Sequence, residues 1–177
     1  MCRAKSFLII LAVLLVFPPS SVRAYQVGKR HRPSVAQRTA DYGRYNFSFT
    51  TLEGRRISLS DYAGKVVLVN LWAPWCAPCK KEIPGFQNLY KRYHRKGFEV
   101  LGVAVQTNET DVRSFVEAYK MVWPIGIKDA VAVGYKTYVL PDTYLFRTDG
   151  SLAKHFVGYT AEEALRPLLE ELLRTPK

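Results

Sequence analysis

The sequence predicts an α/β domain in which a mixed β-sheet is flanked by helices on both faces. Residues 66–72 and 98–105 are aliphatic runs with few polar breaks, as is typical of strands buried on both faces of a sheet. Each run is followed by a segment whose apolar residues recur at helical spacing. Two further strand patterns, 142–147 and 152–157, are separated by a turn at 148–151 and followed by a helical segment. This order of strands and helices is typical of a mixed sheet covered on both sides.

Residues 1–24 have the pattern of a targeting segment. Arg3 and Lys5 precede an uninterrupted apolar run at 7–17, and 22–24 has the small-x-small form that signal peptidase recognises. A membrane span needs about 20 apolar residues, so a cleaved signal peptide is expected, with an uncleaved N-terminal anchor as the alternative. Cys2 precedes the apolar run, which argues against a lipid-attached cysteine. In either case the domain is expected in the periplasm or otherwise outside the cytosol.

Residues 25–45 form a basic lead-in without apolar periodicity, and 46–177 form a single domain. The chain has a formal net charge of +11, and the lead-in contributes cations but few acids. It is expected to be mobile, with order beginning near 42–45. No basic motif interleaved with aromatic residues marks a nucleic-acid site, so no nucleic-acid partner is expected.

The domain is expected to open on a hairpin at 46–58. Phe47, Phe49 and Thr51 alternate with polar residues, and Gly54 lies in the turn at 52–55. A short turn then leads to the buried strand 66–72. The hairpin is therefore an N-terminal extension of the sheet-forming region.

Three helices and one extended piece are expected between residue 76 and the strand at 142–147. The first helix runs from the cysteine pair to about Arg95, with Gly97 as its stop. A second helix covers 110–120, an extended piece covers 123–127, and Asp129 caps a short third helix.

Thr160 and Glu163 form a capping box for a last helix. Pro167 within that helix predicts either a bend or an early end of its first turn.

Cys76 and Cys79 are separated by two residues, and Pro78 fits the opening turn of a helix. A cysteine at a helix N-terminus lies near unpaired N–H groups and the positive end of the helix dipole, which favour the thiolate. Two thiols on one turn can also close into a disulfide and reopen it, so the pair indicates redox chemistry.

A zinc site and a static disulfide are the alternatives for this pair. Zinc needs about four ligands. The candidate partners are three scattered histidines that are expected at the surface: His31, His94 and His155. A static disulfide across so short a loop would stabilise the fold less than a long crosslink.

The sequence Trp-Cys-Ala-Pro-Cys after a buried strand resembles the thioredoxin superfamily. The longer run at 75–84, WCAPCKKEIP, resembles its TlpA/ResA/DsbE branch of extracytoplasmic thiol–disulfide oxidoreductases. The resemblance covers residues from about Phe47 to Leu173. It implies a thioredoxin fold with an N-terminal β-hairpin extension and an inserted βα element.

The resemblance also implies roles for the residues around the pair. Cys76 is the exposed, attacking thiol, and Cys79 resolves the mixed disulfide. Glu82 lies three residues beyond Cys79, roughly on the same helical face. If it is partly buried, its pKa rises and it can relay a proton; otherwise it is a solvated glutamate favoured by the helix dipole. Asn70 stands where thioredoxin has a buried aspartate, and it cannot ionise.

Pro141 matches the cis-proline of the superfamily, whose preceding residue, here Leu140, pairs by its backbone with the substrate peptide. A trans proline that opens an edge strand is the alternative. Leu140 is an apolar residue where the family often has a small or polar one. Trp75 is expected as a partly exposed contact platform and Trp72 as packed against the fold, while Pro78 tunes the redox pair.

The expected activity is that of a thiol–disulfide oxidoreductase, acting as a protein-disulfide reductase. Its partners are disulfide-bearing exported proteins, such as apocytochromes c or copper-site assembly proteins, and a membrane thiol relay of the DsbD/CcdA type. It is expected to work as a monomer, without cofactor or metal.

Three rival functions stay open. A thiol peroxidase of the peroxiredoxin-related branch has threonine three residues before its cysteine, whereas Ala73 stands there in this chain. Copper carriers of similar fold use a CxxxC spacing and a distal histidine, and neither is evident. A redox-inert adaptor is the third rival.

Overall fold

This computed structural model describes residues 40–174. The targeting segment 1–24, most of the basic lead-in and His31 lie outside the described residues. The helices and strands, in chain order, are β1 (Ser48–Thr50), β2 (Arg56–Ser58), β3 (Val66–Trp72), α1 (Ala77–Tyr93), β4 (Phe98–Ala104), α2 (Glu109–Tyr119), β5 (Ile125–Ile127), α3 (Asp129–Tyr135), β6 (Asp142–Phe146), β7 (Leu152–Val157) and α4 (Glu162–Arg174). Short 3-10 turns lie at Gly43–Tyr45, Leu59–Tyr62 and His94–Lys96.

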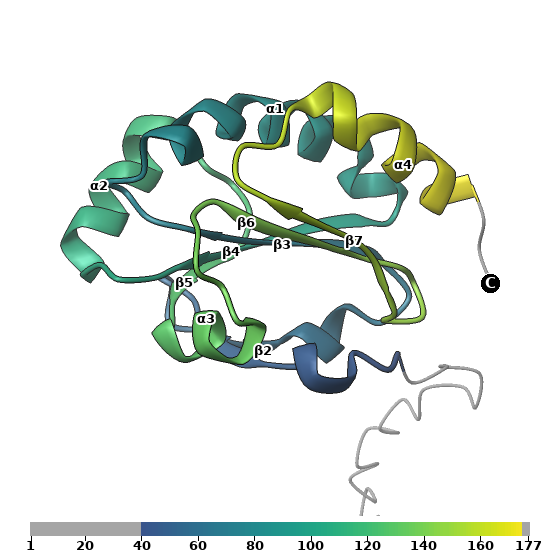
Figure 1. Ribbon diagram of the computed structural model, residues 1–177, viewed down its shortest axis with the longest axis horizontal. Helices are drawn as coiled ribbons and strands as arrows, with labels where there is room; N and C mark the ends of the chain where they lie inside the picture. The colour runs from purple at the N-terminus through teal and green to yellow at the C-terminus, as the bar shows by residue number, and fades with distance from the viewer. Residues whose placement is uncertain (1–39, 175–177) are drawn as a thin grey trace, which may run out of the picture. The chain divides into compact units, whose positions relative to one another are not determined.

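The central sheet has five strands in the order β5-β4-β3-β6-β7 (Figure 1). The strands β3, β4 and β5 are mutually parallel, whereas β6 and β7 run antiparallel to their neighbours. The strands β1 and β2 form a separate hairpin that is attached to the β5 edge through a bridge between Thr51 and Gly126. The predicted mixed sheet and N-terminal hairpin are confirmed, and β5 and α3 form a βα pair between α2 and β6.

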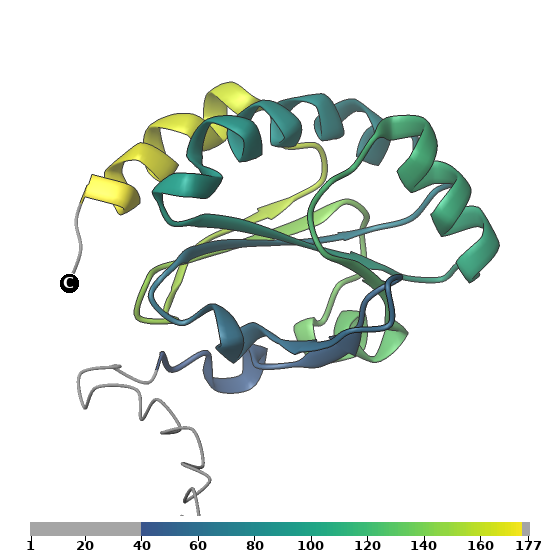
Figure 2. The ribbon, with the colours of Figure 1, turned by 180° about the vertical axis from the view of Figure 1, so that it is seen from behind.

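Helices cover both faces of the sheet. Figures 1 and 2 show α1, α2 and α4 on one face, and α3 with the β1–β2 hairpin on the other. The strand β3 is buried along its whole length because its alternate residues face two different apolar clusters. Val66, Leu68 and Trp72 belong to the cluster under α1, and Val67 and Val69 to the cluster that also holds residues of α3.

Asp41 and Tyr42 both contact the domain. The Tyr42 ring is buried and packs edge-on against Phe146, with centroids 5.5 Å apart. The amide of Asp41 donates to the carbonyl of Asp149 in the β6–β7 turn. Because β6 runs antiparallel to β3, this turn lies at the end of the sheet where β3 begins.

Two predicted helix caps are wrong, and in each case a residue distant in sequence bonds one polar group of the expected capping residue. Thr160 precedes α4 by two residues; its hydroxyl donates to the carbonyl of Gly158 and its amide donates to Glu82. Asp129 is the first residue of α3, and its carboxylate accepts the amide of Gln106.

The helix α4 continues past Pro167 to Arg174, so its first turn does not end early. Within residues 40–174, no helix is both long and apolar enough to cross a membrane.

Candidate functional site

The turn between β3 and α1 holds the cysteine pair at the N-terminus of the helix. Cys76 is the N-cap residue of α1, and Pro78 lies in the opening turn, where a missing N–H costs no helical hydrogen bond. The amide of Cys79 donates to Sγ of Cys76 at 3.2 Å. The two sulfurs form a disulfide with an S–S distance of 2.04 Å. The free amides and the dipole of α1 therefore act on Cys76, the sulfur at the helix end.

Both cysteines are buried, although the resemblance implied an exposed Cys76. Cys76 is 3% exposed and Cys79 is 1% exposed. Both belong to the apolar cluster under α1, and Leu140 packs against this cluster. Cys76 is the more exposed of the two, as expected, but in the disulfide form only a small part of it reaches the surface.

Trp75 lies beside the disulfide and is 59% exposed, as predicted for a contact platform. Its indole Nε1 donates to the carbonyl of Gln106 at 3.0 Å. Gln106 has a left-handed backbone with φ +51°, and its amide is bound by the carboxylate of Asp129 at 2.6 Å. The loop after β4 therefore orients the ring of Trp75. Trp72 is buried in the core, as expected.

The bond between Leu140 and Pro141 is cis, as the resemblance implied. In the β3–β6 ladder Asp142 lies opposite Leu71, so Pro141 lies at the end of β3, close to the turn that leads to Cys76. The carbonyl of Pro141 accepts the amide of Gly158 at 2.8 Å. Among residues 40–174, no partner bonds the backbone N–H or C=O of Leu140.

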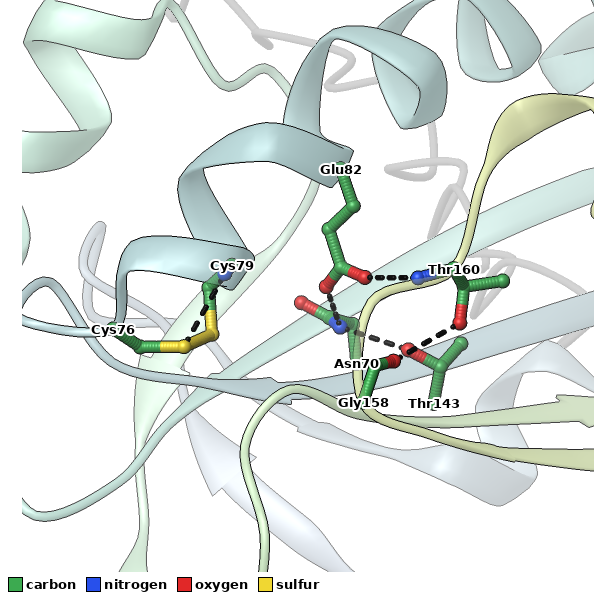
Figure 3. Close-up of a disulfide and its surroundings, with 7 residues drawn as sticks. All are labelled: Asn70, Cys76, Cys79, Glu82, Thr143, Gly158 and Thr160. Carbon is green, nitrogen blue, oxygen red and sulfur yellow. Dashed lines mark hydrogen bonds between the residues drawn. A yellow bond between two sulfur atoms is a disulfide. The ribbon is translucent and has the colours of Figure 1, made fainter.

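Glu82 is buried one turn beyond Cys79, and its side chain reaches down to the sheet (Figure 3). Its Oε1 accepts the side-chain amide of Asn70 at 2.8 Å, and its Oε2 accepts the backbone amide of Thr160 at 3.2 Å. Asn70 also donates to the hydroxyl of Thr143 at 3.0 Å. Burial raises the pKa of Glu82 to about 8, against the opposing effect of the two hydrogen bonds. The alternative of a solvated glutamate is therefore wrong.

Sequence reasoning missed the partners that hold these groups. Thr143 and Thr160 lie 73 and 78 residues from the side chains they bond, and Gln106 lies 31 residues from Trp75. The strand pattern of β6 could have indicated Thr143, because it lies two residues after the candidate cis-proline and side chains alternate between the two faces of a strand. No local pattern points to the other two.

Among the described residues, His94 and His155 do not join the cysteine pair. His94 lies at the C-terminal end of α1, 3.6 Å from Glu99. His155 is exposed at the surface, as expected, and its Nε2 bonds Asp142 at 2.5 Å while its ring stacks on Tyr144. Within residues 40–174, no three His, Cys, Asp or Glu side chains are grouped so that they could hold a metal ion.

Comparisons with known proteins agree with this geometry. The model of the AhpC/TSA family matches residues 44–155. The thiol–disulfide oxidoreductase ResA of Bacillus cereus is 36% identical over 129 residues, which cover 72% of this chain and 75% of the relative. A putative thiol:disulfide interchange protein DsbE from Chlorobium tepidum aligns with a TM-score of 0.68 at 25% identity, covering 72% of this chain and 93% of that one. StoA from Bacillus subtilis aligns with a TM-score of 0.60 at 28% identity, covering 69% and 94%.

A helix-capping cysteine pair closed as a disulfide is the feature that a thiol–disulfide exchange enzyme requires, and the sequence relatives carry that activity in their names. This chain therefore belongs to the AhpC/TSA family, and within it to the thiol–disulfide oxidoreductases similar to ResA.

Proposed function

We propose that this protein works outside the cytosol as a reductant of disulfides in exported proteins. The observation that carries the proposal is the position of the disulfide at the N-terminus of α1, next to the unpaired backbone of Leu140. An extended substrate segment can add its backbone there and bring its own disulfide to the sulfur of Cys76.

The reaction is two successive thiolate displacements. In the reduced protein the Cys76 thiolate attacks one sulfur of the substrate disulfide; an S–S bond forms to the substrate, and the second substrate sulfur leaves as a thiolate. Cys79 then loses its proton and attacks Sγ of Cys76, which forms the Cys76–Cys79 disulfide and releases the first substrate sulfur. Two electrons pass to the substrate, and its two sulfurs end as thiols.

Glu82 takes the proton from Cys79 in the second displacement. It lies one turn beyond Cys79 on α1, and its pKa of about 8 lies close to that of an ordinary thiol, about 8.5. A base and an acid of similar pKa exchange a proton with little free-energy cost. Asn70 keeps the carboxylate beneath α1 by its hydrogen bond.

Trp75, Pro78, Leu140 and Pro141 form the substrate-binding surface. Trp75 offers an exposed aromatic face on one side of the disulfide. Leu140 offers an apolar side chain and free backbone groups on the other. Val139 and Tyr159 are also exposed, which adds apolar area near the cis-proline. An unfolded polypeptide with apolar residues near its cysteines fits this surface better than a charged one does.

The proposed location rests on the pattern of residues 1–24, and the proposed partners rest on the family resemblance. Residues 1–24 act as a signal peptide, and the protein works as a monomer. A membrane thiol relay of the DsbD/CcdA type reduces its disulfide after each turnover. Candidate substrates are apocytochromes c before haem attachment, and copper-site assembly proteins.

A trapping experiment tests the proposal. Cys79→Ala leaves Cys76 able to attack but removes the resolving thiol, so substrates stay bound as mixed disulfides. In the native host this variant should carry exported cysteine proteins that dithiothreitol releases, whereas the control Cys76→Ala/Cys79→Ala carries none. The purified wild type should have a reduction potential nearer to that of thioredoxin, about −270 mV, than to that of DsbA, about −120 mV. An oxidising potential would contradict the reductant role.

The rival activities give different results in the same material. A thiol peroxidase would consume peroxide with Cys76 alone, so the Cys79→Ala variant would keep its activity with a thiol co-substrate. A copper carrier would retain Cu(I) stoichiometrically after dialysis, and the double cysteine variant would lose it. Neither result is expected here.

A further inference from the structure

Asp142 directly follows the cis-proline and carries a buried carboxylate with three side-chain partners. Its Oδ2 accepts the hydroxyl of Thr137 at 2.6 Å and lies 3.0 Å from the hydroxyl of Tyr144. Its Oδ1 lies 2.5 Å from Nε2 of His155. The side chain is 3% exposed. A carboxylate buried to this degree is costly unless such partners hold it, so the four side chains behave as one unit.

The bond between Thr137 and Asp142 closes the segment that bears Leu140 and Pro141. Thr137 and Asp142 are the two ends of this segment, and residues 138–141 between them form no helix or strand. The Thr137 end is also fixed to α3, because its amide donates to the carbonyl of Ala132 at 2.9 Å. The segment therefore spans from α3 to β6 with both ends held.

His155 holds the carboxylate from the neighbouring strand. In the β6–β7 ladder His155 lies opposite Tyr144, and the two rings stack with centroids 4.1 Å apart. The stacking fixes the imidazole so that Nε2 faces Asp142. The unit thus joins the end of α3 to β6 and β7 on one face of the sheet. Glu82 lies on the opposite face, in α1.

We propose that Asp142 is a positioning residue, which through Thr137 and His155 fixes the Leu140–Pro141 backbone in the place where substrate docks. The proposal rests on the proposed function, in which that backbone contacts the substrate. It assigns Asp142 no contact with the reacting sulfurs. Loss of the Thr137–Asp142 bond therefore weakens the binding of polypeptide disulfides and leaves the chemistry of the Cys76–Cys79 pair intact.

The test compares Thr137→Val with Thr51→Val. Both changes keep the branched side chain and remove a hydroxyl that closes a turn, but the Thr51 hydroxyl accepts the amide of Arg55 in the β1–β2 hairpin, away from the site. Thr137→Ser restores the hydroxyl and serves as the rescue. Asp142→Asn removes the carboxylate itself. If that variant does not fold, Thr137→Val still tests the proposal, because it leaves Asp142 in place.

Two reactions are measured for each folded variant. The first is reduction of a peptide with an intrachain disulfide by the reduced protein, resolved into kcat and KM. The second is reduction of the Cys76–Cys79 disulfide by dithiothreitol, which needs no docking of a peptide. Thr137→Val should raise KM for the peptide about fivefold, as expected for one lost hydrogen bond, with kcat and the dithiothreitol rate unchanged. Thr137→Ser and Thr51→Val should match the wild type.

Two results would overturn the positioning role. One is an unchanged KM in Thr137→Val; the other is an equal loss in both reactions, which a general loosening of the fold would give. Failure of the proposed function is a separate result, because then the wild type itself would not reduce the peptide.

Discussion

The side-chain amide of Asn70 and the carboxylate of Glu82 are joined by a buried hydrogen bond of 2.8 Å that links β3 to α1. The acid thus lies within the protein, one helical turn from the resolving sulfur, although its sequence neighbours Lys80 and Lys81 are exposed. Because the side chain of Asn70 cannot ionise, Glu82 is the titrating group of this pair.

Glu82→Gln should change the pH dependence of stability. The pKa of Glu82 is raised from 4.5 to about 8 on folding, so between these values the folded protein binds more protons than the unfolded chain. The stability of the wild type therefore falls as pH rises through this window, and the full penalty is present above about pH 8. The variant escapes this penalty, and each pKa unit corresponds to about 1.4 kcal/mol, so the variant should gain a few kcal/mol relative to the wild type between pH 4.5 and pH 9.

Urea unfolding of the oxidised proteins at several pH values measures this difference. Glu117→Gln, at an exposed position of α2, is the control; it retains Glu82, so its stability should follow the pH dependence of the wild type. A constant difference between Glu82→Gln and the wild type across the window would contradict the raised pKa.

Leu140→Ala should expose the disulfide. Leu140 packs against the cluster that contains both cysteines, which are nearly inaccessible. Removal of its three outer carbon atoms should speed reduction by dithiothreitol several-fold, measured by release of thiols under excess reagent. Leu168→Ala removes the same atoms from a half-buried leucine of α4 that packs on the same cluster, and it should leave the rate unchanged. Equal rates in both variants would show that Leu140 does not limit access.

Asp129→Ala should increase the mobility of the Trp75 side chain. The carboxylate of Asp129 holds the amide of Gln106, whose carbonyl binds the indole of Trp75. Without this acceptor the left-handed Gln106 loses a partner, and stability should fall by about 1 kcal/mol. The fluorescence anisotropy should also fall, because Trp75 is the exposed tryptophan. Trp75→Phe in the same background should abolish the anisotropy change; persistence of the change would place its origin at Trp72 or Trp123.

Two glycine-to-alanine changes should have opposite effects on stability. A Cβ at Gly126 would lie 2.3 Å from the ring of Phe49 and 2.4 Å from the carbonyl oxygen of Thr50, so Gly126→Ala should destabilise the fold by about 1–3 kcal/mol. A Cβ at Gly134 in α3 meets nothing within 4 Å, so Gly134→Ala should stabilise it by up to about 1 kcal/mol. Midpoints of urea unfolding measure both. Equal midpoints would mean that the hairpin does not pack closely on β5.

The parts of the fold that were predictable are those that local chemistry determines. The aliphatic run of β3, the turn at Gly54 and the position of Cys76 at a helix start depend on residues close in sequence. The cis bond before Pro141 has no local cause, and only the resemblance to a known family indicated it.

The parts that could not be predicted depend on competition between local and distant partners. At Thr160 the sequence offered a capping box, but Glu82, 78 residues away, takes the amide. At Ser58 the same kind of local bond forms, with the amide of Ser58 bound by Asp61 at 2.7 Å. The patterns are alike, and only packing of α1 against the start of α4 decides between them. The unit of Thr137, Asp142 and His155 could not be predicted for the same reason, because its members come from different elements that only the tertiary fold brings together.

The hydrogen bond from Asp41 to Asp149 has a practical consequence. It fixes the entry of the N-terminal segment at the β6–β7 turn, at the opposite end of the sheet from the disulfide. A label coupled at Asp41, which is exposed, would therefore lie at the end of the sheet opposite Cys76 and Cys79 and would leave the disulfide side of the molecule unobstructed.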